Sequence, residues 1–479
     1  MGGETWIGRQ DENTIVGVDM TKRKLVGVLG VIAIASGVVL GAGAQARVAD
    51  TAEDLKSDNI ELLKQAPIEL DEGVLADGSD LAFQNKLIAA GSFQGTGFYK
   101  IVSPRQGHIK QVGMHICPGS QGDVSLWGKY LFVSIDAPAT NNAESNICNN
   151  TATNRSDSSL EKEGIRIVDI SNVRQPRQVG FVETDCGSHT HTLVPDGKKL
   201  FMYVSSYPIS GQGPSCNHAT HRKFSIVEID LKNPAKSDVV ATPALPPDTV
   251  GCHDFTVFPA RDFGMAACLG VWLTLDISDP ADPQILSETR NPLIELDHST
   301  ALTWDGKYAL IGDEHAGAAG GGGCSPNSDS PVGALWIYDV KDPENPEELS
   351  HISLPRVPTV DDANEAQRFR CTTHNFNIVP MKKKNKYVAI VSYYSGGIAA
   401  IDFSDPEDPQ EVAHYVHLGE NGVNPDTWAS YWYNGKIYTN DHLSKYGVGV
   451  YELKGTGQKD AFYFKGNVNP QTQIANFRK

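Results

Sequence analysis

Hydrophobic and polar positions alternate in short runs along most of the chain, and clusters of Pro, Asp, Gly and Asn separate the runs. Residues 253–283 contain the pattern in full. An apolar run reaches a turn at 259–262, a second run returns from it, and a third run over 271–275 ends in the turn sequence DISDPADP. A short fourth run follows at 284–287. Because alternation favours strands and Pro with Asp favours turns, this stretch predicts a hairpin followed by two more short strands.

The ending of the third run is repeated along the chain. It recurs in plain or degenerate form at 165–176, 224–236, 335–346, 398–409, 97–104 and 448–455. Aligned on these copies, the chain divides into the units 80–114, 121–182, 186–241, 252–289, 297–354, 371–418 and 426–465. Repeats of roughly 40–60 residues with four short strands are typical of propellers, in which a blade needs neighbours to cover both faces. We therefore predict an all-β fold, a seven-bladed β-propeller of four-stranded blades.

The residues of the repeat also carry a family resemblance. Its apolar-Val-Asp-Ile-Ser-Asp-Pro core resembles the LVIVD-repeat family of secreted bacterial proteins over nearly all of 80–465. The resemblance implies a propeller and little about activity, since most members have no assigned chemistry. The turn at 276–280 and the pair His253-Asp254 are similar, more weakly, to the propellers of methanethiol oxidase and selenium-binding proteins. That second likeness implies a metal-dependent oxidoreductase, although a shared fold does not establish function.

Composition narrows the class of protein and of partner. The 479 residues are 40% hydrophobic and 21% charged, which is typical of a globular chain long enough for one large repeat domain. The formal net charge of −17 argues against binding to nucleic acid or to anionic membrane surfaces, because both select basic patches. The expected partner is instead an unknown small ligand or an extracellular protein.

The N-terminal region predicts export. The basic segment 21–24 precedes an apolar segment at 25–40, and small residues follow up to Ala46. This order is typical of a signal peptide, expected over 1–46 with Met20 as the true start, so the residues before Met20 are either an over-long gene prediction or a genuine extension. An uncleaved anchor is the alternative, because an apolar segment of this length is marginal for a membrane span. We expect a secreted or extracytoplasmic protein without membrane attachment after cleavage.

Two segments flank the predicted propeller at 80–465. Residues 47–79 form an acidic lead-in, in which the stretch 53–64 is compatible with a short amphipathic helix before Pro67. We expect the lead-in either to pack on the propeller or to stay mobile. Residues 466–479 form a C-terminal tail.

The cysteines are expected to form disulfides, because their number is even and the protein is expected to be exported. In a four-stranded blade, the loops between the second and third strands share one rim with the loops that join blades, and every cysteine maps to that rim. The simplest pairing is sequential: Cys117–Cys148, Cys186–Cys216, Cys252–Cys268 and Cys324–Cys371. Cys252 and Cys268 have the best support because they lie symmetrically about the turn at 260–261. The cysteines allow roughly a hundred connectivities, so the pairing stays open.

Histidines occupy one shared position in four successive units. Each lies six residues before the residue that begins the first turn of its unit, and the four are His189, His253, His298 and His374. First strands line the central channel of a propeller, so these imidazoles should meet at the channel end that carries the cysteines. His191, two residues after His189, should point the same way and is the expected fifth member. Carboxylates accompany them at Asp254, Asp297 and 313–314.

This group of imidazoles is suited to binding a metal. Imidazole is the commonest protein ligand of zinc, copper and iron, and three or four imidazoles leave room for water or substrate. The pattern therefore predicts a transition metal, copper, iron or zinc, as the cofactor, with the ligands His189, His253, His298, His374 and His191. Two other interpretations stay open. The histidines could bond loop carbonyls as a copied structural feature, without any cofactor, or they could bind an organic ligand or sense pH.

Two functions fit these observations, and the residues alone leave open whether the protein is an enzyme. The first is an exported propeller scaffold that binds a ligand or partner on its loop-rich, disulfide-stapled rim, with axial histidines that could hold a metal. The alternative is a copper- or iron-dependent oxidoreductase resembling methanethiol oxidase. No catalytic residue is assigned, because the cysteines are expected to be oxidised and no serine stands in a strand-turn-helix elbow.

Overall fold

A computed structural model of the chain describes the residues 54–136, 163–208, 221–247, 249–314, 331–355, 370–417 and 426–478. The predicted signal peptide lies outside the described residues. Within them the regular structure is β-strand, apart from the short 3-10 helices η2 (Pro234–Lys236) and η3 (Pro259–Arg261). No helix in this part of the chain is both long enough and apolar enough to cross a membrane.

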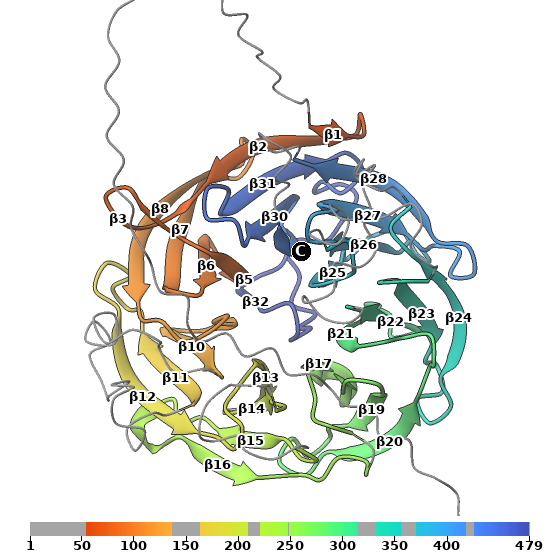
Figure 1. Ribbon diagram of the computed structural model, residues 1–479, viewed down its shortest axis with the longest axis horizontal. Coiled ribbons are helices and arrows are strands. Elements are labelled where there is room, and N and C mark those ends of the chain that lie inside the picture. Colours follow the sequence, from red (N-terminus) through yellow and green to blue (C-terminus); the bar gives the residue numbers. More distant parts are fainter. Residues whose placement is uncertain are drawn as a thin grey trace, which may run out of the picture. The chain divides into compact units, whose positions relative to one another are not determined.

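Seven antiparallel sheets form the blades, numbered here in chain order (Figure 1). The first three blades contain β5 (Gly78–Gln84), β6 (Leu87–Ser92), β7 (Gly95–Ser103) and β8 (His108–Ile116); β9 (Val124–Trp127), β10 (Tyr130–Ile135), β11 (Gly164–Asp169) and β12 (Arg177–Glu183); and β13 (Thr190–Asp196), β14 (Lys199–Ser205), β15 (Ser225–Glu228) and β16 (Asp238–Ala241). The next three contain β17 (Asp254–Phe258), β18 (Phe263–Ala267), β19 (Trp272–Asp276) and β20 (Gln284–Thr289); β21 (Asp297–Leu302), β22 (Tyr308–Asp313), β23 (Leu335–Asp339) and β24 (Glu347–Ile352); and β25 (Phe376–Ile378), β26 (Val388–Ser392), β27 (Ile398–Asp402) and β28 (Gln410–Val416). The seventh contains β29 (Thr427–Tyr433), β30 (Lys436–Asp441) and β31 (Val448–Leu453).

The blades form a closed ring. The first strand of each blade contacts the first strand of the next, and β29 of the seventh blade contacts β5 of the first. Figure 1 shows these inner strands around the centre, with the later strands of each blade farther out. The predicted all-β, seven-bladed propeller of four-stranded blades is therefore confirmed. Because the inner strands converge, residues at their starts come together although they are far apart in sequence.

Side chains packed between neighbouring blades hold the ring together. Tyr203 of β14 and Phe224, which precedes β15, both contact Phe255 of β17, with ring centroids 5.6 and 4.7 Å apart. All three side chains are buried. Burying a side chain of this size stabilises a fold by roughly 1.5–3 kcal/mol, so each blade gains much of its stability from the blade beside it.

The seventh blade takes its outer strand from the N-terminal side of the propeller. β2 (Ile60–Ala66) pairs antiparallel with β31. The amphipathic helix predicted over 53–64 is therefore wrong. Ile60 and Leu63 have a helical spacing, whereas Ile60 and Leu62 have the spacing of a strand. The open edge of β31 decides between them, because its backbone groups would otherwise lack partners.

Three shorter strands lie near β2 in the sequence. β1 (Leu55–Lys56) pairs with β28 and so extends the sixth sheet. β3 (Ile68–Asp71) and β4 (Val74–Ala76) form a two-stranded hairpin. Most of the predicted lead-in that the structure describes is therefore strand, and part of it belongs to the blades.

The last residues of the chain lie along the inner strands. β32 (Asn467–Val468) pairs with β5, and Figure 1 shows it toward the middle of the ring. Oδ1 of Asn469 accepts a hydrogen bond of 2.8 Å from the backbone N–H of Leu126. Gln473 bonds both the N–H and the C=O of Leu302, at 2.9 and 2.7 Å. These amide side chains satisfy backbone groups that the inner edges of the sheets leave open, so the tail is part of the central packing.

The disulfide that joins Cys252 and Cys268 is present, as predicted. It links the loop that enters β17 to the end of β18. Cys117, Cys186 and Cys371 are disulfide-bonded as well, and the partners predicted for them lie outside the described residues.

Removing β2 tests how the ring is closed. A chain that starts at Pro67 exposes the edge of β31 and loses the burial of Ile60, so it should unfold at a lower temperature than a chain that starts at Asp54. The loss should be at least roughly 2 kcal/mol from that side chain alone. Calorimetry measures it, and gel filtration should reveal association through the open edge. Equal melting temperatures would show that the ring does not need this strand.

Replacing Cys252 and Cys268 together by Ser tests the confirmed disulfide, which closes a sequence separation of 16 residues. The free energy of unfolding should fall by about 2–4 kcal/mol, because the unfolded chain is no longer restricted. Denaturant titration without reductant measures the change.

The denatured, unreduced parent protein should have almost no reactive thiol. Several free thiols in a thiol titration would contradict the interpretation as an exported, oxidised protein.

Candidate metal centre

The structure brings together the four histidines of the shared position. His189, His253, His298 and His374 lie at the starts of the inner strands of the third to sixth blades. Successive ring centroids are 4.4, 3.8 and 4.3 Å apart, and all four side chains are buried. The rings form a row across four adjacent blades, and we call these four residues the histidine row.

A bulge in the fifth blade places His298 in the row. Asp297 pairs with Asp313 and Ser299 with Gly312, so His298 is an extra residue without an opposite partner. A bulge turns a side chain out of the normal alternation of a strand, and bulges are frequent beside functional sites. The direction of this ring is therefore set by pairing between two strands.

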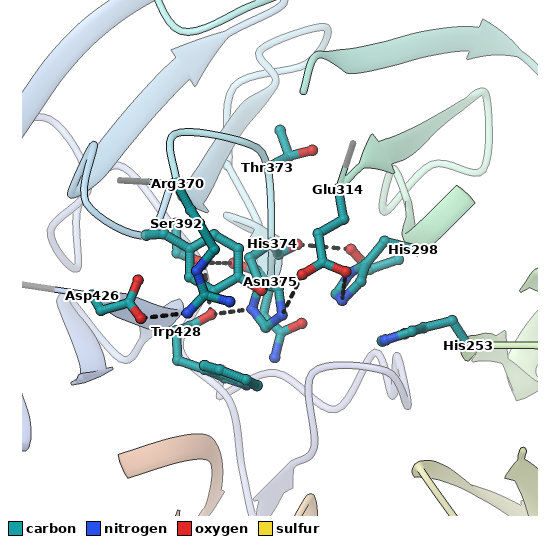
Figure 2. Close-up of polar contacts among 12 residues, drawn as sticks. His253, His298, Glu314, Arg370, Thr373, His374, Asn375, Ser392, Asp426 and Trp428 are labelled. Atoms are coloured by element: carbon teal, nitrogen blue, oxygen red, sulfur yellow. Dashed lines mark hydrogen bonds and ion pairs between the residues drawn. The ribbon is translucent and has the colours of Figure 1, made fainter. Parts of the chain in front are cut away.

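Glu314 supplies a carboxylate beside the row. It follows β22, and its oxygens lie 3.6 Å from Nε2 of His298 and 4.0 Å from Nε2 of His374. Figure 2 shows the carboxylate directed toward both rings, with His253 approaching from the other side. One donor atom from each of His253, His298 and Glu314 lies within 4.8 Å of the other two, and all three residues are buried. Two imidazoles and a carboxylate make up a donor set that suits zinc, copper or iron.

Hydrogen bonds hold the first two rings in the row. The carboxylate of Asp136 can only accept, so Nδ1 of His189 donates to it at 2.6 Å. Nε2 of His189 and Nε2 of His253 lie 2.9 Å apart, so one of these atoms donates a hydrogen bond to the other. Tyr207 adds its hydroxyl 3.3 Å from Nε2 of His189. Nδ1 of His253 has no hydrogen-bond partner among the described residues.

The last ring of the row is held by the seventh blade. Nδ1 of His374 donates to the backbone carbonyl of Trp428 at 2.6 Å, and the two rings are 4.7 Å apart. Nε2 is then the unprotonated nitrogen, and it faces Glu314. An Nδ1–H bonded to a carbonyl is a common way to fix the tautomer and direction of a metal-binding histidine.

His298, in the middle of the row, has no hydrogen bond at either ring nitrogen within the described part of the chain. Its side chain is buried, and an unsatisfied buried polar group costs roughly 1–3 kcal/mol. Burial lowers the pKa of His253, His298 and His374 well below the usual value and raises the pKa of Glu314. The three rings are therefore neutral near pH 7, the state in which imidazole binds metals.

A second layer of residues holds Glu314. The hydroxyl of Tyr394 donates to Glu314, and the guanidinium of Arg370 lies 3.9 Å from the centroid of the Tyr394 ring. Arg370 also pairs with Asp426 (Figure 2). Tyr394 has φ 49°, a left-handed conformation that is unfavourable for a residue with a side chain and that the surrounding contacts maintain.

Sequence reasoning named Glu314 as a neighbouring carboxylate and did not find Tyr394, Arg370 or Trp428. These residues come from different blades or from loops between strands, and they share no position in the repeat. The run Asp313-Glu314 next to a strand end was the one signal available. An alignment of the repeats finds residues that recur at the same position in several blades, and it misses residues that occur in one blade alone.

His191 lies beside a buried carboxylate, Asp123, which lines the same small cavity as His253 and His374 of the row. Its Nδ1 is 2.7 Å from the hydroxyl of Ser134 and 3.1 Å from Oδ2 of Asp123, and that oxygen also accepts its backbone N–H at 2.9 Å. Asp123 and Asp80 line a cavity of about 20 Å³, which has room for about one water. The contacts described for His191 do not include the histidine row. Nε2 of His191 has no hydrogen-bond partner among the described residues, and its place in a metal site stays a prediction.

Another group of donor residues, Asp185, Cys186 and His221, lies on the same rim with donor atoms within 4.8 Å of one another. Cys186 is disulfide-bonded. Its sulfur is therefore not the thiolate that a metal requires. The histidine row with Glu314 is the better candidate among the described residues.

Comparison with known proteins found no match in sequence and distant similarity in structure. No family profile matches the sequence, and no curated protein matches it. Among solved structures, Kuenenia stuttgartiensis hydrazine synthase is similar, at 13% identity and a TM-score of 0.49 over 78% of this chain and 93% of that one. A structure of S. cerevisiae dbp5 bound to nup159, gle1, IP6 and ADP is similar at 12% identity and a TM-score of 0.46, over 82% and 95%. Likenesses this distant say nothing about what the present chain binds.

Proposed function

We propose that this protein is an exported β-propeller that binds one transition-metal ion at the histidine end of its channel, with His253, His298 and Glu314 as ligands. The observation that carries the proposal is the state of His298. It is buried, both of its ring nitrogens lack hydrogen bonds among the described residues, and it faces a buried carboxylate. A bound cation would satisfy these groups together, because it accepts the imidazole lone pair and balances the carboxylate charge.

The donor set supports zinc, copper or iron as the metal. Imidazole nitrogen suits these ions, whereas calcium and magnesium prefer oxygen donors. His374 could complete the set, because its Nε2 is unprotonated and lies 4.0 Å from Glu314. Asp136 and the carbonyl of Trp428 would act as the outer partners that orient His189 and His374.

A structural role for the row explains only part of it. His189 and His374 each bond a neighbouring group through Nδ1, as expected for residues that only tie loops together. His253 and His298 have nitrogens without such partners in the described residues. A histidine repeated only for a structural role would make the same hydrogen bond in every blade. The nitrogens of His253 and His298 that lack partners therefore favour a bound ligand.

Export and family membership are part of the same proposal. Oxidised cysteines favour an extracytoplasmic compartment, and the N-terminal sequence has the order of a signal peptide. The repeated third-strand ending supports membership of the LVIVD-repeat family. The rim that carries the histidine row is also where a small ligand or an extracellular partner would bind.

Replacing His253 and His298 together by Ala should abolish metal binding and leave the fold intact. Protein purified without chelator should contain near one zinc, copper or iron per chain by elemental analysis, and the double variant should contain almost none. His108→Ala, which changes an exposed histidine on β8, is the matched control and should keep the metal. Circular dichroism checks the fold of all three. Stoichiometric metal in the folded double variant would refute the proposed site, as would a parent protein that stays metal-free after soaking.

A metal-dependent oxidoreductase, resembling methanethiol oxidase, is the second candidate. The observation that favours it is the Tyr394 hydroxyl bonded to Glu314, which places a redox-capable phenol beside a proposed ligand. Copper or iron would supply one-electron and oxygen chemistry, whereas zinc would not.

Oxygen uptake with small reduced sulfur compounds tests this second candidate. The metal-loaded protein should consume oxygen, and Tyr394→Phe should lower the rate at least about tenfold while keeping the metal, because the phenol is lost but the ligands are not. The double variant His253→Ala, His298→Ala is the inactive control. Zinc as the native metal, or no uptake with copper or iron bound, would leave the metal-binding scaffold as the function.

A further inference from the structure

A larger pocket lies at the other end of the inner strands. It has a volume of about 550 Å³, and it is lined by the turn after β21, the turn after β25 and the C-terminal segment. Trp304, one of its lining residues, follows His298 by six residues and lies in the turn that leaves β21. At about 3.3 Å per residue, some 20 Å of chain separates the pocket from the histidine row. The volume is in the range of small-molecule sites.

Three aromatic rings form one wall of this pocket. Phe477 lies 5.3 Å from Trp304 and 5.1 Å from Phe462, measured between ring centroids. The indole N–H of Trp304 donates to the carbonyl of Ile378 at 2.8 Å, so its polar atom is satisfied within the protein. Phe462 is 37% exposed and is the one aromatic among the exposed large hydrophobic side chains of the described residues. An exposed aromatic ring at a pocket is a typical contact for an apolar ligand.

Lysines form the other wall. The pocket is lined by one aspartate, Asp305, and by the lysines Lys307, Lys382, Lys383, Lys384 and Lys386. Lys307 pairs with Asp305, Lys386 with Asp402, and Lys382 bonds a backbone carbonyl. Lys383 and Lys384 are exposed, and neither side-chain ammonium group has a hydrogen bond or ion pair among the described residues. A chain with a formal net charge of −17 thus carries a local excess of positive charge beside an aromatic wall.

We propose that this pocket binds an organic anion with a flat apolar body and a single carboxylate or sulfonate group. The aromatic wall would contact the apolar body, and Lys383 and Lys384 would attract the charged group. An inorganic anion would not use the rings, and a long polyanion would be repelled by the acidic remainder of the protein. The site is separate from the proposed metal centre and does not depend on it.

The test uses 1-anilinonaphthalene-8-sulfonate as the probe and isothermal titration calorimetry on the folded protein. We expect one site per chain. Lys383→Glu combined with Lys384→Glu should weaken binding about tenfold, since each reversed surface charge changes the binding free energy modestly. Phe462→Ala should weaken it about fivefold or more. Removing metal with a chelator should leave probe binding unchanged.

A matched pair of lysines controls for general charge. Lys198→Glu with Lys199→Glu reverses two adjacent lysines at the equivalent turn of the third blade, and it should leave the affinity unchanged. Binding that is insensitive to both pocket variants would overturn the proposal, because the probe would then bind elsewhere. Displacement of the probe by sulfate as readily as by naphthalenesulfonate would also overturn it, because the aromatic wall would then contribute nothing.

Discussion

Closure of the ring is the constraint on which the rest of this structure depends. A four-stranded blade has two apolar faces, and it can cover them only with the blades on either side. The contact between β29 and β5, together with the pairing of β2 on β31, makes the first and last blades neighbours. An open ring would expose two apolar blade faces and one unpaired sheet edge to water, and this exposure would destabilise the fold. The N-terminal strand is therefore as much a part of the last blade as its own hairpins.

The closed ring also explains why a polar site can form in the interior. The inner strands converge, so one position copied in four blades becomes four adjacent rings, while burial removes the water that would otherwise hydrate them. Neutral imidazoles tolerate that loss if each nitrogen finds a partner. Asp136 and the carbonyl of Trp428 supply partners at the two ends of the row. The middle of the row, at His298, has none among the described residues, and the proposed metal ion would supply one.

The two ends of the inner strands have different chemistry. They stay separate because the loops that enter the first strands and the turns that leave them lie on opposite rims of the propeller. The histidine row, Cys252 and Cys371 lie where the chain enters first strands, whereas the turns that leave those strands carry the lysines and Trp304. The C-terminal segment bonds the inner strands through Asn469 and Gln473 and also contributes Phe477 to the pocket.

The number of blades, the class of fold and the histidine row could all be read from the residues, because strand alternation, turn chemistry and a copied position are local or repeated properties. The tertiary structure decided the remainder. The stretch 53–64 has apolar spacings that suit a helix or a strand, and the unpaired edge of β31 selects the strand. Glu314 and Tyr394 reach the row from single blades, so no repeat records them. His191 contacts Ser134 and Asp123 of the preceding blade, and these contacts between blades are not contained in the spacing of the sequence.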